Sequence, residues 1–404
     1  PHYAGQMLKP PHPVAMAAYI ATMMLNPNNH SIDGGRATTM MEREVLKDMA
    51  AMFGYPEEFL GHLTWSGTTA NLEALWVSRE INPNLAIAHS EDSHYTHTRM
   101  AEVLNVPAIA IATDAVGRMD LNDLEQKLKS GKIGTVVATL GTTGLGAVDP
   151  LAEIIPLARQ YGARVHVDTA YGGFFTLIRE DLDVEAARHY AAIADSDSVV
   201  VDPHKHGLQP YGCGAVFFRD RSIGRFYKHD SPYTYFASED LHFGEIQLEC
   251  SRAGASAAAL WATLKVFPLT GDGLGAVLRA GRKAATSWYE LIQASDCLVA
   301  LQKPELDIVT YFPNLATLEA IDHVSQELFQ RSAAPTRSEQ IHLATYVMKQ
   351  SGFAKRGFDI PKDSTRESAR IMRSVLMKPE QENWIPDLHS HVENLTRSII
   401  KEMK

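Results

Sequence analysis

A short segment near the middle of the chain, DSVVVDPHKHGLQPYG at residues 197–212, gathers four side chains that can do chemistry. An apolar run ends at Asp202, and His204, Lys205 and His206 follow it. Two interpretations are open. Asp202, His204 and His206 could bind a metal ion, with the lysine incidental. Alternatively, Lys205 is the working group, because a desolvated amine has a lowered pKa and can attack carbonyl groups.

The lysine is the more informative of these side chains. Lysine is rarely placed at the end of a buried strand unless it is paired or functional. The chain has 17 histidines, so two close together are weak support for a metal site. Structural zinc would favour cysteine ligands, and the segment itself contains none. These observations favour Lys205 and predict no metal.

The elements that must position these residues alternate from residue 61 onward. Short apolar runs predict strands buried on both faces, as in a parallel sheet covered by helices, at residues 85–90, 108–113, 135–142, 163–170, 198–204 and 214–219. Helices are predicted between them at residues 71–81, 120–130 and 151–161. After a helix at 251–267, strands at 306–313 and 370–379 and helices at 316–331 and 382–403 predict a smaller α+β domain.

Polar groups follow four short apolar runs: SGTTAN after LTW, GTTG after VVATL, DTAYGG after VHV, and DPHKH after VVV. Ligands of doubly wound sheets bind outside the carboxyl ends of the strands. SGTTAN would offer a helix N-terminus to a phosphate group, although Ser66 or Thr68 could equally be a plain helix cap. Asp168 stands beside small residues, so it could bond a nitrogen of a flat ring or cap the next helix.

Composition narrows the class of protein. The chain has 404 residues, which predicts a large domain at 51–290, a smaller one at 291–404 and an N-terminal helical segment at 1–50. The net charge of −10 disfavours nucleic acid and membranes as partners, and leaves a small molecule. Three widely spaced cysteines predict no disulfide framework and a reducing, cytoplasmic location. No apolar run approaches the ~20 residues of a membrane span. The chain begins at Pro1 rather than at methionine, consistent with a missing upstream segment.

With SGTTAN, HYTH, HVDTAYGG and DPHK in this order, the chain resembles the group II pyridoxal-phosphate-dependent amino-acid decarboxylases. That family includes glutamate, aromatic-amino-acid and tyrosine decarboxylases. The resemblance runs from KPPHPVA to RIMRSVLMKP, nearly the whole chain. It implies fold type I of the PLP-dependent enzymes: a large domain with a mostly parallel, seven-stranded-type sheet covered by helices, plus the smaller C-terminal α+β domain. It also implies a homodimer, with segment 1–50 packing on the partner.

The resemblance carries roles onto individual residues. Lys205 would bind pyridoxal 5′-phosphate (PLP) covalently, and Asp168 would keep the pyridine nitrogen protonated. His94 would stack on one face of the ring, with Ala170 under the ring. The remaining matches are Gly67, Thr68 and His204 at the phosphate, Thr143 near the 3′-oxygen, Arg373 at the substrate α-carboxylate, and Asp149 with Arg252 as a bracing pair. Asp202 stands where many members have asparagine and bacterial tyrosine-type members have aspartate.

The segment ASEDLHFGEIQLECSR at 237–252 departs from the family. Many relatives place there a tyrosine that donates a proton to the carbanion left by decarboxylation. This chain offers His242 instead, and Tyr233 and Tyr235 precede the segment. Without the donor, oxygen-dependent deamination to an aldehyde would become a side reaction or the main one.

The resemblance thus implies decarboxylation of an L-amino acid to an amine and CO₂. LECSRAGASAAALWATL resembles the bacterial tyrosine decarboxylases, which favours an aromatic substrate such as tyrosine. Glutamate, aspartate and 2,4-diaminobutyrate are the alternative substrates. Two further classes stay open: a metal-dependent hydrolase using Asp168, Asp202, His204 and His206, and a non-catalytic relative.

Overall fold

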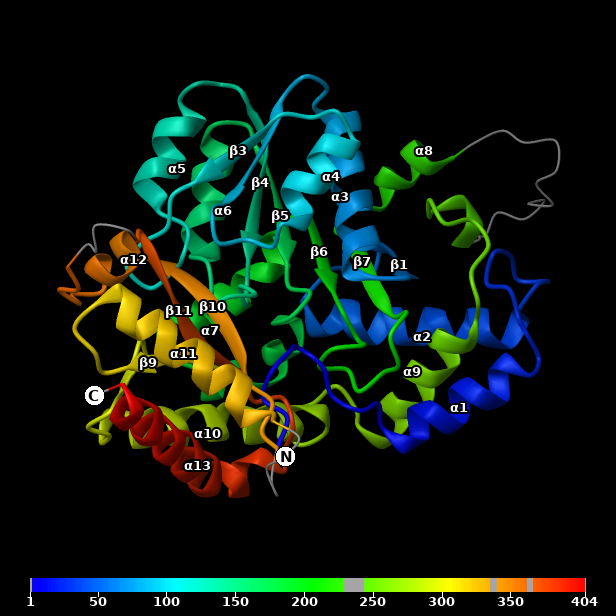
Figure 1. Cartoon of the computed structure of the whole chain (residues 1–404). Coiled ribbons are helices and arrows are strands. Elements are labelled where there is room, and N and C mark those ends of the chain that lie inside the picture. Colours follow the sequence, from blue (N-terminus) through cyan, green and yellow to red (C-terminus); the bar gives the residue numbers. More distant parts are fainter. Residues whose placement is uncertain (1, 229–242, 335–339, 362–365, 404) are drawn as a thin grey trace.

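Two β-sheets form the framework of the protein in a computed structural model, which describes residues 2–228, 243–334, 340–361 and 366–403 (Figure 1). The larger sheet has seven strands in the order β1-β7-β6-β5-β4-β2-β3, and the smaller has four in the order β10-β11-β9-β8. The strands are β1 Leu60–Thr64, β2 Ala86–Ser90, β3 Ala108–Ile111, β4 Ile133–Thr139, β5 Arg164–Asp168, β6 Ser198–Val201, β7 Gly214–Phe218, β8 Leu298–Ala300, β9 Ile308–Pro313, β10 Ala344–Lys349 and β11 Ser368–Val375.

Helices cover the sheets and connect the strands. They are α1 Pro13–Met23, α2 Arg36–Met52, α3 Gly67–Ile81, α4 Thr96–Val103, α5 Leu121–Leu128, α6 Leu151–Gln160, α7 Val184–Ala191, α8 Gly224–Tyr227, α9 Ala255–Val266, α10 Leu274–Gln293, α11 Leu318–Ser332, α12 Gln350–Lys355 and α13 Gln381–Glu402. Short 3₁₀ segments are η1 Gly173–Asp181, η2 Ala192–Asp195, η3 Arg221–Ile223 and η4 Phe243–Glu245. No helix in the described part of the chain is long and apolar enough to cross a membrane.

The larger sheet is mostly parallel, which confirms the predicted fold class. Strands β3, β2, β4, β5 and β6 run parallel, whereas β7 is antiparallel to both β6 and β1. Two antiparallel pairings in succession make β1 point the same way as the parallel strands. The carboxyl ends of β1, β2, β4, β5 and β6 therefore meet at one edge of the sheet.

The apolar runs were predicted to be buried on both faces, and β4 and β6 are buried throughout. In β4, Val137 belongs to a cluster with Leu75 of α3 and Met100 of α4. Its neighbour Val136 belongs instead to the main core. The prediction is wrong for β3, where Ala108 and Ala110 are exposed, because β3 is the edge strand of the sheet.

Helix α10 links the two parts of the molecule, and it packs beside α13 under the smaller sheet (Figure 1). Leu278 in its first half belongs to the main core, whereas Trp288 in its second half belongs to the core of the smaller part. The predicted boundary at residue 290 falls inside this helix. Near the N-terminus, Tyr3 pairs with His342 and Ala4 lies in the smaller core, so this segment packs on the C-terminal part of its own chain.

Candidate active site

The polar strand ends meet in one cavity of about 270 Å³, close to the ~300 Å³ lower end of ligand pockets. The nine residues predicted to bind the cofactor all line it, and Arg373 does not. The lining residues are Ser66, Gly67, Thr68, Asn71, His94, Tyr95, Thr96, Thr139, Gly141, Thr143, Asp168, Ala170, Tyr171, Asp202, His204 and Lys205.

Lys205 is held against a buried carboxylate at the end of β6. Its Nζ lies 3.0 Å from Oδ2 of Asp202, and the lysine side chain keeps 20% exposure toward the cavity. His204 Nδ1 lies 2.7 Å from the carbonyl oxygen of Cys213, while its Nε2 lies 3.5 Å from the same carboxylate oxygen of Asp202. Burial lowers the pKa of His204, so its imidazole is neutral near pH 7. Lys205 is therefore the positive charge that faces Asp202.

On the opposite wall of the cavity, the backbone at the start of α3 lies close to Asp202. Ser66 caps the helix, since its Oγ accepts from the N–H of Thr69 at 3.2 Å. A Cβ added to Gly67 would lie 2.5 Å from Oδ2 of Asp202, a distance that real Cβ atoms do not show. The glycine is needed here for space, and among the described residues the N–H groups of Gly67 and Thr68 have no acceptor, so they stay open to a ligand.

Asp168 ends β5, and a histidine that the sequence analysis missed holds it. His97 Nε2 lies 2.9 Å from Oδ2 of Asp168, and the N–H of Ala170 donates to Oδ1 at 3.0 Å. Burial alone would raise the pKa of this carboxyl. The hydrogen bond and charge of His97, with the Ala170 N–H and Lys205, outweigh burial and hold the pKa of Asp168 well below its usual range. The carboxylate stays ionised, ready for a cationic N–H.

His94 lies just before α4, three positions before His97 in the sequence. Its Nδ1 accepts from the N–H of Thr96 at 3.2 Å, which fixes the ring, and its ring centroid lies 4.3 Å from that of Tyr95. Burial lowers the pKa of His94, with the charge of Lys205 adding and that of Asp168 opposing. A neutral, half-buried imidazole suits contact with a flat ring.

A second network that the sequence analysis missed runs behind the cavity. Asn71, one turn after Gly67, donates to the Gly67 carbonyl oxygen at 2.9 Å and contacts His166 Nε2 at 2.9 Å. His166 Nδ1 lies 2.8 Å from Ser198 Oγ. Burial lowers the pKa of His166 to about 3, so the ring is a neutral link between α3 and two strands. The sequence held one indication of each missed residue. His97 follows His94 within HYTH, and Asn71 follows Gly67 within SGTTAN.

Arg373 lies on β11, in the smaller part of the molecule, and reaches the loop after β4. Its Nε donates to the carbonyl oxygens of Thr143 at 2.8 Å and of Gly144 at 3.2 Å. Its Nη2 is buried without a hydrogen-bond partner among the described residues. Thr143 lines the cavity, so the arginine sits one residue behind its wall.

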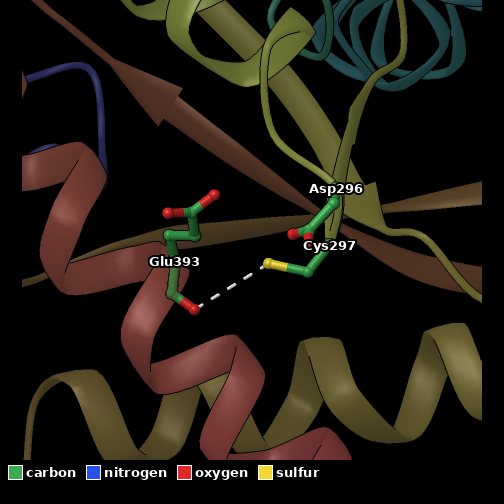
Figure 2. A group of neighbouring side chains, drawn as sticks. All are labelled: Asp296, Cys297 and Glu393. Atoms are coloured by element: carbon green, nitrogen blue, oxygen red, sulfur yellow. Dashed lines mark hydrogen bonds between the residues drawn. The ribbon is translucent and has the colours of Figure 1, made fainter.

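His206 does not line this cavity, so it does not form a metal site with Asp202 and His204. Its ring packs against Tyr171, and its Nε2 lies 3.4 Å from Oδ2 of Asp307. Within the described residues, the metal-like grouping found is instead Asp296, Cys297 and Glu393, between β8 and α13 (Figure 2). Arg397 already pairs with both carboxylates of that group, at 2.6 Å from Asp296 and 3.2 Å from Glu393.

One predicted pair is wrong. Asp149 accepts from the N–H groups of Met119 and Thr139, each at 2.7 Å, and does not contact Arg252. Arg252 pairs instead with the buried carboxylate of Glu42. The predictions for Tyr233, Tyr235 and His242 concern residues outside the described ranges.

Residues 69–312, more than half of the chain, match the family described as the pyridoxal-dependent decarboxylase conserved domain. The chain belongs to this family. It is a decarboxylase with PLP as its cofactor, so the metal-hydrolase and non-catalytic alternatives are set aside. The decarboxylase is similar to the L-tyrosine decarboxylase of Enterococcus faecium, at 27% identity over 82% of this chain and 72% of the relative. It is also similar to the probable L-aspartate decarboxylase of Pyrococcus furiosus, at 29% identity over 76% of this chain and 81% of that protein.

The fold of the decarboxylase is shared with solved structures. That of Oryza sativa TDC with PLP and tryptamine superposes with a TM-score of 0.85 at 19% identity, covering 98% of this chain and 84% of that one.

The polar atoms that line the cavity of the decarboxylase fit PLP. Oδ1 of Asp202 and Oγ1 of Thr139 are buried in the cavity wall without partners among the described residues. Buried polar atoms are normally hydrogen-bonded, so these atoms indicate a polar ligand. The helix N-terminus suits a phosphate, the ionised Asp168 suits a ring N–H, and Lys205 suits an aldehyde.

Proposed function

We propose that the cavity at the carboxyl edge of the larger sheet is the decarboxylation site and that its lining residues act as the family resemblance implies. Lys205 would bind the cofactor covalently through its Nζ. The N–H groups at the start of α3, with Gly67, Thr68 and His204, would hold the phosphate, and Asp202 would pair with Lys205 beside them. The support is the convergence of these residues on one cavity from separate strand ends.

When bound, PLP supplies a protonated pyridine ring that accepts the electron pair left at Cα as CO₂ departs. Asp168 would hold the proton on the pyridine nitrogen, because its carboxylate is kept ionised by His97. His94 would pack on one ring face and Ala170 on the other, and both would limit the access of water to the reacting carbon. Thr143 would lie near the 3′-oxygen of the cofactor.

Arg373 would bind the α-carboxylate of the substrate. Its guanidinium is buried and pairs only with carbonyl oxygens among the described residues, which leaves its charge free to meet a carboxylate. Because the arginine is anchored to the loop that carries Thr143, the α-carboxylate would be held at a fixed position relative to the cofactor.

The substrate is proposed to be an aromatic amino acid such as tyrosine. One observation carries this choice: Lys205 is the sole lysine or arginine among the described residues that line the cavity. Apart from Lys205, the described lining has no cation that could pair with the side-chain carboxylate of aspartate or glutamate. Burying an unpaired charge is unfavourable in free energy. Tyr95 and Tyr171 line the cavity and offer aromatic surface instead.

The test is CO₂ release from tyrosine, tryptophan, glutamate, aspartate and 2,4-diaminobutyrate, with amine, aldehyde and peroxide measured in the same reactions. We expect tyrosine to give CO₂ and amine in equal amounts without peroxide. Preference for an acidic amino acid would overturn the substrate assignment. Aldehyde and peroxide in amounts equal to CO₂ would establish oxidative deamination as the main reaction.

The enzyme is further proposed to be a homodimer in the cytoplasm. Helix α1 is apolar around most of its surface, yet only Ala15 of its residues is buried. Ile20 and Met23 are each 55% exposed, and Met24 and Leu25, just beyond the helix, are exposed as well. Such a surface on a helix is typical of an interface. Sedimentation equilibrium should show a dimer that the double change Ile20→Glu and Met23→Glu dissociates, and a monomeric wild type would contradict it.

The cytoplasmic assignment rests on the cysteines. All three are free thiols: Cys213 and Cys297 are buried and Cys250 is exposed. An exposed free thiol is expected in a reducing compartment.

A further inference from the structure

A second cavity, of about 1010 Å³, lies between the N-terminal segment and the smaller part of the molecule. It shares no lining residue with the cofactor cavity. Much of its wall is apolar, formed by four prolines together with Leu208, Phe267 and Val277. A cavity of this size is at the upper end of the ~300–1,000 Å³ range of small-molecule sites.

Two lysines face this cavity although they are nearly buried. Lys9 is 8% exposed and Lys378 is 9% exposed. Within the described residues, neither has a carboxylate within ion-pair distance. Buried lysines are almost always paired, so two unpaired ones side by side need an explanation.

The hydrogen bonds of the two lysines differ. Lys378 Nζ donates to the carbonyl oxygens of Tyr3 at 2.8 Å and Leu8 at 3.3 Å, and it lies over the ring of Tyr3. Lys9 Nζ has one acceptor among the described residues, the carbonyl oxygen of Met377 at 3.3 Å. An ammonium group has three N–H donors, so two of those on Lys9 remain unused.

The electrostatics of the pair favour an anion. Burial lowers the pKa of Lys9 to about 8; the more distant carboxylate of Asp307 opposes this shift and the charge of Lys378 adds to it. Burial also lowers the pKa of Lys378 to about 8. The two lysines share the lining of the cavity with one carboxylate, that of Glu380. In a chain with a net charge of −10, this cavity is a locally positive site.

We propose that this cavity is a second ligand site, which binds a small carboxylate with an apolar body. The carboxylate would accept the unused N–H donors of Lys9, with Lys378 as the neighbouring charge, and the body would pack against Leu208, Phe267 and Val277. The amine product of decarboxylation has no carboxylate, so it is not the ligand of this site.

The probe is hexanoate, titrated calorimetrically into the PLP-loaded enzyme, with hexan-1-ol and inorganic phosphate as comparisons. We expect one hexanoate per chain, and binding weakened tenfold or more by Lys9→Met. Lys265→Met, which changes an exposed lysine that pairs with Glu44, should leave binding intact. Arg373→Ala should also leave it intact. Loss of binding in Arg373→Ala but not in Lys9→Met would place hexanoate in the active site and overturn the proposal. Equal binding of phosphate would overturn the need for an apolar body.

A measurement on the wild type covers the case in which Lys9→Met does not fold. Acetic anhydride at pH 8 acetylates neutral amines, and peptide mass spectrometry reports the rate at each lysine. Hexanoate should slow the acetylation of Lys9 fivefold or more and leave that of Lys265 unchanged. An unchanged rate at Lys9, at a hexanoate concentration that saturates the calorimetric signal, would contradict the proposal. These tests measure hexanoate binding and lysine acetylation rather than decarboxylation, so their outcome is separate from that of the proposed function.

Discussion

His97 Nε2 lies 2.9 Å from Oδ2 of Asp168, and both side chains are buried. This contact joins the first turn of α4 to the end of β5 and opposes the effect of burial on the pKa of Asp168. His97 is a positioning residue: it acts on the reaction through the carboxylate that would hold the pyridine proton.

His97→Ala should therefore raise the pKa of Asp168 and reduce kcat by roughly 10–100-fold, the scale expected for a misplaced catalytic group. A carboxyl with a raised pKa loses its charge at a higher pH, so the acid limb of the kcat profile should move to higher pH. His89→Ala is the matched control, because His89 lies beside His97, with ring centroids 6.0 Å apart, and is not bonded to Asp168. An acid limb that stays in place would contradict the role.

Gly67→Ala should weaken PLP binding about tenfold or more. The added Cβ would lie 2.5 Å from Oδ2 of Asp202, and overpacking of this kind costs about 1–3 kcal/mol. Fluorescence titration of the apoenzyme with PLP measures the change. Gly224→Ala is the control, because its Cβ would meet nothing closer than 3.9 Å. Equal PLP affinity in the two variants would contradict the requirement for glycine at residue 67.

Arg373→Ala should raise the KM for the amino acid roughly 10–100-fold, since a charge-assisted hydrogen bond contributes about 1.5–3 kcal/mol. The cofactor absorbance should not change. Arg373→Lys should not restore the KM, because lysine cannot form the bidentate pair. Arg370→Ala is the control on the same strand, where the arginine pairs with Asp322. Loss of the cofactor absorbance in Arg373→Ala would mean that the arginine serves the cofactor instead.

Asp149→Asn tests the corrected role of that residue in stability. Burial raises the pKa of Asp149 to about 7, with the N–H groups of Thr139 and Met119 opposing the shift. The folded state thus binds a proton more tightly than the unfolded state, and the contribution of Asp149 to stability falls as pH rises from about 4 to about 7. Asparagine has one acceptor oxygen for two N–H donors, which should cost about 1–3 kcal/mol at pH 5.

The difference in Tm between wild type and Asp149→Asn should therefore narrow from pH 5 to pH 8, because only the wild type carries a buried charge at high pH. A difference that widens over this range would contradict the assignment. Arg252→Gln should show no coupling to Asp149→Asn, since the two side chains do not touch.

Local sequence patterns predicted the larger sheet well, because a buried parallel strand has a continuous apolar run and its polar terminus marks the ligand edge. They failed where the partner is distant in sequence. The contact of His97 with Asp168 spans 71 positions, and nothing in HYTH shows which histidine faces the carboxylate. Likewise, Asp149 and Arg252 were predicted to pair with each other, yet each has a different partner in the structure. The exposure of β3 depends on its place at the sheet edge, which its own residues do not encode.

The central claim is that Lys205 carries the cofactor. The most direct measurement is borohydride reduction of the PLP-loaded enzyme, followed by peptide mass spectrometry to locate the fixed cofactor. We predict one modified lysine per chain, Lys205, and no modification in Lys205→Ala. Lys9 and Lys378 are the natural competitors, since burial lowers the pKa of each to about 8. Cofactor fixed on either of these lysines, with Lys205 unmodified, would contradict the account.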